Sequence, residues 1–292
     1  MRGNAEEHDL IAPGNLAAVL ELLAAEPGKW TPIAGGTELM VAFSAGRLNT
    51  AKLVSLWGIR DLSFIEASAG SVAIGAATTF LDLRRDAAIA ADFPLLARAA
   101  SWIGSIANQS RATLGGNLVN GSPAADSSPA LLAYDAEIEM ISVRGKRRAG
   151  YWEFHTGYKR NLLAGDELLY AIHLPRRFAK HKHYLRKVGT RRAMAIAKVA
   201  LGATARVESG AIKEILLGAA SLAPYPIRLR QTEAALLGQT LWGENVEAAS
   251  RALLDEIKPI DDIRSTAEYR RRVAVNLLRE FLSELRREGS TT

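Results

Sequence analysis

The sequence predicts a protein of two domains that mixes helices with strands. Its 292 residues are 48% hydrophobic and 23% charged, an ordinary globular composition, and this length favours two domains over one. Patterns typical of helices and of strands alternate along the first part of the chain. After the segment DELLYAIHLP, which ends at residue 175, a strongly basic stretch begins, and helices dominate from there to the end. We therefore expect one domain over residues 1–175 and a second over residues 176–292.

Apolar periodicity places the elements of the first domain. Residues 15–26 have leucine and valine at helical spacing behind Asn15, a favourable N-cap residue. A second helix is expected to begin near Pro94, in the segment FPLLARAASWIGS, because proline is favoured in the first turn. Short apolar or alternating runs predict strands at residues 51–56, 71–76 and 137–143.

In the second domain, residues 197–221 read as two strands joined at a Ser-Gly turn. The last helix is expected to start at Ser265, where Ser265 and Glu268 form a capping box. An apolar stripe then follows at i, i+4 spacing, formed by Val273, Leu277, Phe281 and Leu285.

Composition excludes several kinds of site. Cysteine is absent, so the chain has no disulfide, no thiolate metal site, no iron–sulfur cluster of its own and no thiol nucleophile. His181 and His183 lie among lysines that would repel a metal ion, and we expect no metal site. No apolar stretch reaches the length of a membrane helix, and the N-terminus lacks the apolar segment of a secretory signal. We therefore expect a cytoplasmic protein without a membrane partner.

The net charge of +6 raises the question of a nucleic-acid partner. The densest basic stretch runs from Arg176 to Arg192 and holds two aromatic residues, but it has no RNA-binding signature. A solvated connection between the domains explains this stretch equally well, and so do cations placed near a bound phosphate. We expect no nucleic-acid partner.

Two glycine-rich segments share a pattern, IAGGTEL at residues 33–39 and ATLGGNLVNGSPAAD at residues 112–126. Adjacent glycines let successive backbone N–H groups point into one concavity, which can bind phosphate. Neither segment matches the P-loop or the GxGxxG pattern. A tight turn between a strand and a helix explains each segment as well. Asp126 can accept a hydrogen bond from a sugar or ribityl hydroxyl, or it can cap the helix that follows.

The segments AGGTEL and ATLGGNLVNGSPAADSSPALLAYDAEI resemble the FAD-binding subunit of the molybdenum hydroxylases, the relatives of xanthine dehydrogenase and of aerobic carbon monoxide dehydrogenase. The resemblance extends in family order through SVAIGAATTF, FHTGYKRNLLAGDELLYAIHLP, LRKVGTRRAMAIAKVALGA, GAASLAPYPIRLRQTEAALLG and STAEYRRRVAVNLL. Nearly the whole chain is covered.

The resemblance implies an α+β fold, in which a vanillyl-alcohol-oxidase-like (PCMH-type) FAD-binding domain of two α+β subdomains precedes a smaller C-terminal α+β domain. It implies that two loops bracket the FAD pyrophosphate, and that backbone N–H groups at Gly116 face it. The residues that match the first loop are Ile33, Ala34, Gly35, Gly36, Thr37, Glu38 and Leu39. Those that match the second are Thr113, Gly115, Gly116, Asn117, Ala125 and Asp126. Leu169, with Leu168 as the alternative, and Lys187 fall where the family places a leucine and a lysine near the flavin.

The resemblance also implies a function and partners. Electrons pass from a molybdopterin on a large subunit, through two [2Fe–2S] clusters on a small subunit, to FAD on this chain, and then to NAD⁺, a quinone or oxygen. This chain would carry FAD non-covalently and supply no catalytic residue. Two rivals stay open: a free-standing NADPH-dependent flavoenzyme of the same superfamily, and a non-enzymatic binding module that uses residues 176–192.

Overall fold

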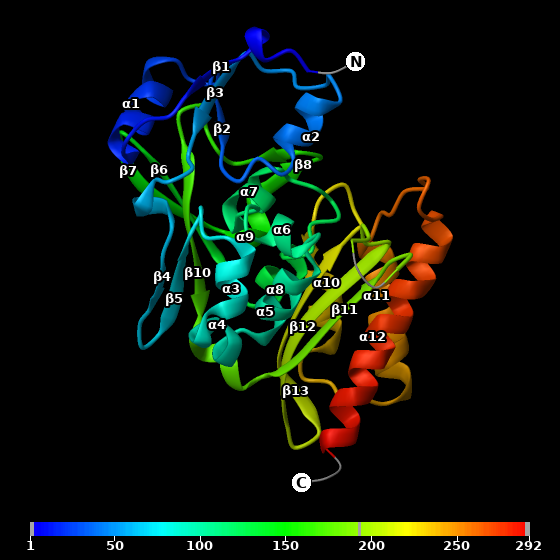
Figure 1. Cartoon of the computed structure of the whole chain (residues 1–292). Coiled ribbons are helices and arrows are strands. Elements are labelled where there is room, and N and C mark those ends of the chain that lie inside the picture. The colour runs from blue at the N-terminus through cyan, green and yellow to red at the C-terminus, as the bar shows by residue number, and fades with distance from the viewer. Residues whose placement is uncertain (1–2, 192–193, 290–292) are drawn as a thin grey trace.

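Three parts of the structure follow one another along the chain (Figure 1). The computed structural model describes residues 3–191 and 194–289. A small N-terminal sheet lies at one end, a central group of helices covers a five-stranded sheet, and a four-stranded sheet with its own helices ends the chain. None of the described helices is long and apolar enough to cross a membrane.

The first part is a parallel three-stranded sheet in the order β1-β3-β2. Asn15 caps α1 as expected, since its side chain accepts from Ala18 N at 2.9 Å. Val19, Leu23 and Val54 are fully or almost fully buried in the core between helix and sheet. The elements are η1 (Ala5–Glu7), β1 (Asp9–Ile11), α1 (Leu16–Ala25), β2 (Thr31–Ile33), α2 (Leu39–Ser44), β3 (Lys52–Ser55) and η2 (Arg60–Leu62).

The second part is an antiparallel sheet in the order β4-β5-β10-β6-β7, covered by short helices. Pro94 begins α5 as the sequence predicts. The strands are β4 (Ile65–Ala67), β5 (Ser71–Gly75), β6 (Glu137–Ser142), β7 (Gly145–Gly150) and β10 (Leu168–Pro175), and β8 (His155–Gly157) and β9 (Arg160–Asn161) form a separate hairpin. The helices are α3 (Phe80–Arg85), α4 (Ala87–Asp92), α5 (Pro94–Trp102), α6 (Ile106–Gln109), α7 (Leu114–Val119), α8 (Ser128–Ala133) and α9 (Tyr151–Phe154).

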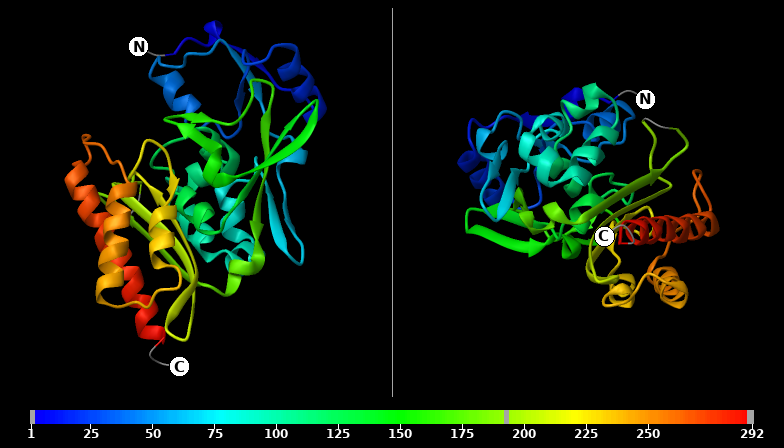
Figure 2. Two further views of the ribbon diagram at one scale, coloured as in Figure 1. Left: turned by 180° about the vertical axis from the view of Figure 1, so that it is seen from behind. Right: turned by 90° about the horizontal axis from the view of Figure 1, so that it is seen from below.

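The third part is an antiparallel sheet in the order β11-β12-β13-β14. The expected pair of strands is confirmed, with Ser209 and Gly210 at positive φ in the turn between them. Long helices lie on the outer face of this sheet, and the central helices lie on the other (Figure 2). The elements are η3 (Arg176–Lys180), β11 (Lys182–Val188), β12 (Val199–Glu208), β13 (Ala211–Ala220), β14 (Ile227–Arg228), α10 (Arg230–Leu236), α11 (Gly243–Glu256) and α12 (Ala267–Gly289).

One of the alternatives left open by the sequence, and one local prediction, were wrong. The basic stretch from Arg176 is not a solvated connection, because most of it forms η3 and β11, and Phe178 and Leu185 are buried there. The capping box at Ser265 does not form as predicted. The hydroxyl of Thr266 accepts from Tyr269 N at 3.2 Å, while Ser265 N donates to the carboxylate of Asp262. Helix α12 therefore begins at Ala267.

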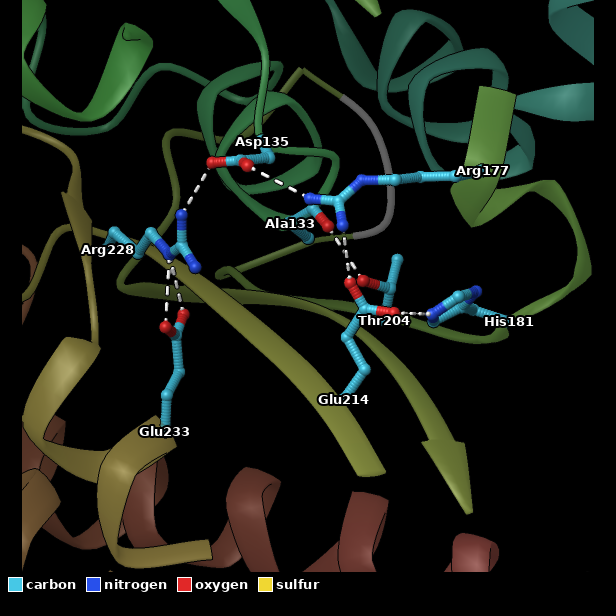
Figure 3. A network of polar contacts seen from close by, with 8 residues as sticks. All are labelled: Ala133, Asp135, Arg177, His181, Thr204, Glu214, Arg228 and Glu233. Atoms are coloured by element: carbon cyan, nitrogen blue, oxygen red, sulfur yellow. Dashed lines mark hydrogen bonds and ion pairs between the residues drawn. The ribbon is translucent and has the colours of Figure 1, made fainter. Parts of the chain in front are cut away.

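Helix α8 joins the central part to the C-terminal sheet. A Cβ on Gly202 or on Gly218 would lie only 2.6 or 2.5 Å from the carbonyl oxygen of Pro129, so β12 and β13 approach the helix backbone directly. Thr204 Oγ1 also donates to Ala133 O at 2.7 Å (Figure 3).

A network of charged side chains surrounds the end of α8. Asp135 accepts from Arg228 at 2.6 Å and from Arg177 at 3.2 Å (Figure 3). The two arginines continue to Glu233 and Glu214, which lie on α10 and β13. The predicted boundary at residues 175 and 176 stays a prediction, because the central core also includes residues from beyond it, namely Phe178, Leu185 and Leu216.

Candidate cofactor site

The first glycine-rich loop offers a row of unused backbone donors. Strand β2 ends at Ile33, Gly36 takes the left-handed conformation at φ +72°, and α2 begins at Leu39. Glu38 occupies the N-cap position of α2, and no side chain caps this helix. Within the described residues, the N–H groups of residues 34–39 have no hydrogen-bond acceptor. Six consecutive free N–H groups in a loop with a left-handed residue form the kind of concavity that binds an anion.

The two glycine-rich loops touch at Gly35. A Cβ on Gly35 would overlap the carbonyl oxygen of Arg111, so only glycine fits there. Arg111 precedes the second loop, whose residues enter α7 through the N-cap residue Thr113. The structure thus brings together the two segments that the sequence pairs.

In the second loop the N–H groups of residues 115–117 donate within the fold. Gly115 N donates to Ala76 O at 2.8 Å, Gly116 N donates to Thr113 Oγ1 at 3.1 Å, and Asn117 N donates to Thr113 O. The expectation that Gly116 presents its N–H to a phosphate is therefore wrong in this structure. Gly116 is exposed, and a Cβ there would meet only the Thr113 hydroxyl, at 2.9 Å. Its contribution is an open face that a ligand can approach closely.

Asp126 pairs with Lys187, which reaches it from β11. Lys187 Nζ donates to Asp126 Oδ2 at 2.6 Å, and the two side chains are only 10% and 12% exposed. The other carboxylate oxygen, Oδ1, is buried without a hydrogen-bond partner. Burial raises the pKa of Asp126 to about 6, although Lys187 acts in the opposite direction. An unpartnered buried carboxylate oxygen indicates a ligand that donates a hydrogen bond there.

The capping alternative for Asp126 was wrong. Helix α8 has Ser127 at its N-cap position, and no side chain makes a capping hydrogen bond to it. Ser127 Oγ instead donates to the side-chain oxygen of Asn117 at 2.6 Å, which ties the second loop to the start of α8.

The two leucines lie in different cores. Leu169 belongs to the central core together with Leu114 and Leu118 of α7, while Leu168 packs in the N-terminal core. Both are less than 5% exposed, and Ala125 is buried as well. The roles of Leu169 and Ala125 at the cofactor stay predictions.

Sequence reasoning missed two cations beside the first loop. Lys159 Nζ lies 3.5 Å from Glu38 Oε1, although 121 residues separate them. Arg111 lies over the ring of Trp57, with 3.7 Å between guanidinium carbon and ring centroid. The only local signal for the first was the segment GYKR, where Lys159 has φ +53° at the hairpin turn.

A hollow of about 570 Å³ opens beside Lys187. Its lining includes an aromatic ring and several cations: Arg98, Trp102, Arg186, Lys187, Val188, Gly189, Thr190 and Arg191. Taken with the free N–H groups and Asp126 Oδ1, the surroundings suit an elongated anionic ligand that carries hydroxyl groups.

Comparisons with known proteins agree with this chemistry. The family described as the FAD binding domain in molybdopterin dehydrogenase matches residues 5–177, and the CO dehydrogenase flavoprotein C-terminal domain matches residues 184–285. The chain is 33% identical over 273 residues to the xanthine dehydrogenase FAD-binding subunit of Escherichia coli O157:H7, covering 92% of each chain. It is 25% identical to the carbon monoxide dehydrogenase medium chain of Hydrogenophaga pseudoflava, over 93% of this chain and 94% of that one.

Solved structures confirm the expected α+β fold. A chain of the carbon monoxide dehydrogenase from Hydrogenophaga pseudoflava matches with a TM-score of 0.89 at 26% identity, covering 94% of this chain and 95% of that one. A chain of a Cu,Mo-CO dehydrogenase matches with the same TM-score at 27% identity, covering 96% and 97%. This chain therefore belongs to the family of FAD-binding subunits of the molybdenum hydroxylases, which are oxidoreductases.

Proposed function

We propose that this chain is the electron-transfer subunit that carries FAD in a molybdenum hydroxylase of several subunits. It takes electrons from the [2Fe–2S] clusters of a small partner subunit, which receives them from a molybdopterin subunit. The observation that carries the proposal is that the site holds two sets of unused polar groups, the N–H groups of residues 34–39 and the buried Asp126 Oδ1. These two features suit the diphosphate and a hydroxyl of FAD.

The chain's own residues bind and orient the cofactor. The N–H groups of residues 34–39 hold the diphosphate, and the bare face of Gly116 lets it approach α7. Lys187 fixes the carboxylate of Asp126, so that its free oxygen accepts from a ribityl or ribose hydroxyl. When bound, FAD supplies the exchange between one-electron and two-electron transfer.

A partner must supply the electrons. The chain has no cysteine, so it cannot hold an iron–sulfur cluster through thiolates. Relatives with similar sequences are named as subunits or medium chains, among them the nicotinate dehydrogenase FAD-subunit of Eubacterium barkeri, which is 26% identical over 87% of each chain. The final acceptor is NAD⁺, a quinone or oxygen. Anaerobic mixing of the reduced complex with each acceptor identifies it.

Purification from the native host tests the proposal. We expect the chain to co-purify with an iron–sulfur protein and a molybdopterin protein, and we expect the substrate of that complex to reduce its flavin. The rival reading as a free-standing flavoenzyme makes the opposite prediction. If NADPH alone reduced the flavin of the isolated chain at a catalytic rate, and no partner co-purified, the proposal would be wrong.

A further inference from the structure

We propose that Arg111, held over Trp57, is a further binding residue for FAD, and that its guanidinium carries positive charge to the diphosphate. This inference rests on the proposed function, because it assigns a ligand to the same site. It concerns a side chain that the glycine-rich pattern does not include.

The backbone places Arg111 at the junction of the two loops. Its carbonyl oxygen lies against Gly35, where any Cβ would overlap it. Its own N–H donates to Asn108 O at 3.1 Å, and the next N–H, that of Ala112, donates to the same oxygen at 2.7 Å. The main chain of Arg111 therefore lies directly against Gly35, whose N–H is one of the free donors of the first loop.

Trp57 directs the side chain. It follows β3 by two residues, and its neighbour Leu56 donates from N to Ile33 O at 2.8 Å, so it lies beside the start of the first loop. Trp57 is 45% exposed, and the guanidinium of Arg111 lies 3.7 Å from the centroid of its ring. Stacking on an aromatic face orients an arginine and leaves its N–H donors free at the edge.

The other two charges beside the first loop offset each other, so Arg111 decides the net charge there. Glu38 lies within the loop and would repel a diphosphate, but Lys159 pairs with it at 3.5 Å and offsets its charge. Arg111 has no acidic partner within the described residues. It therefore supplies one net positive charge where the ligand carries two negative charges. Arginine also matches phosphate oxygens geometrically, with two parallel N–H donors.

Flavin titrations of the deflavinated chain test the inference. We expect Arg111→Ala to weaken FAD binding about ten- to a hundred-fold, the loss typical of one charge-assisted hydrogen bond. Arg111→Lys should keep part of the affinity, because it keeps the charge. Arg251→Ala is the matched control, since Arg251 is also exposed but lies on α11, which packs in the core of the C-terminal domain, and it should bind FAD as the parent chain does.

Two further measurements distinguish an electrostatic role of Arg111 from a structural one. Added salt should weaken FAD binding less in Arg111→Ala than in the parent chain, because the screened charge is gone. Riboflavin, which has no phosphate, should bind both proteins equally. Unchanged FAD affinity in Arg111→Ala would overturn the inference, and so would an equal loss of FAD and riboflavin. Failure of the parent chain to bind FAD would instead refute the proposed function itself.

Discussion

The substitution Gly116→Ala tests whether FAD contacts the second loop at this residue, because it should change FAD binding and leave the fold intact. In the structure the added methyl group would meet only the Thr113 hydroxyl, at 2.9 Å, and would otherwise point into open space. If FAD lies against this face, as we propose, the methyl group occupies the place of cofactor atoms. Gly116→Val makes the same test with a larger side chain.

The expected change in stability is small. Alanine is favoured over glycine inside a helix by about 0.5–1 kcal/mol. Displacing the Thr113 hydroxyl removes the N-cap bond of α7, which costs about 1 kcal/mol. The two effects nearly cancel, so the melting temperature of the apo protein should change by less than about 4 °C. Crowding the cofactor by one methyl group costs about 1–3 kcal/mol, which weakens FAD binding roughly five- to a hundred-fold.

Titration with FAD and a melting curve of each apo protein provide the assay. Gly14→Ala is the control, since a Cβ there meets nothing within 4 Å, and it should change neither quantity. Gly35→Ala should lose both FAD binding and stability, because its Cβ overlaps the Arg111 carbonyl. If Gly116→Ala bound FAD as tightly as the parent chain, the second loop would not contact the cofactor at this residue.

Further predictions concern Asp126 and the residues that pack around α8. Asp126→Asn should weaken FAD binding about ten- to a hundred-fold; unchanged affinity would remove Asp126 from the site. The pKa of Asp126 is raised to about 6 from 3.8, so the apo protein should lose stability as pH rises between these values. FAD affinity should increase as pH rises through 6. Asp126→Asn should flatten both pH profiles, which urea melts and FAD titrations from pH 4 to 8 measure. Gly218→Ala places a Cβ 2.5 Å from Pro129 O and should lower the free energy of unfolding by about 1–3 kcal/mol in a urea melt. Asp135→Asn should lower it by only about 1 kcal/mol, because asparagine suits the positive φ there and the ion pairs of Asp135 are partly exposed.

Local patterns predicted much of the fold. Helix α1 with its Asn15 cap, the start of α5 at Pro94 and the turn at Ser209 and Gly210 all depend on residues within a few positions of one another. Such short-range preferences are visible in a single sequence. The same reasoning placed the cap of the last helix one residue too early, since the hydroxyl of Thr266, and not that of Ser265, accepts the capping hydrogen bond.

The site was harder to predict than the elements. Asp-Ser-Ser-Pro before an apolar run is typical of a helix start, yet Asp126 binds Lys187, 61 residues away. Both loops contain Gly-Gly, yet only in the first do the glycines keep their N–H groups free, because Gly115 N donates to Ala76 O and Gly116 N to Thr113 Oγ1. Long-range contacts decided each outcome, and no local pattern reports them.

The flavin content of the purified chain tests the central claim most directly. Acid precipitation should release one flavin per chain into the supernatant, because the cofactor is held non-covalently. Chromatography should identify it as FAD and not FMN, since the free N–H groups of residues 34–39 suit a diphosphate. A colourless chain that also fails to take up added FAD would contradict the account.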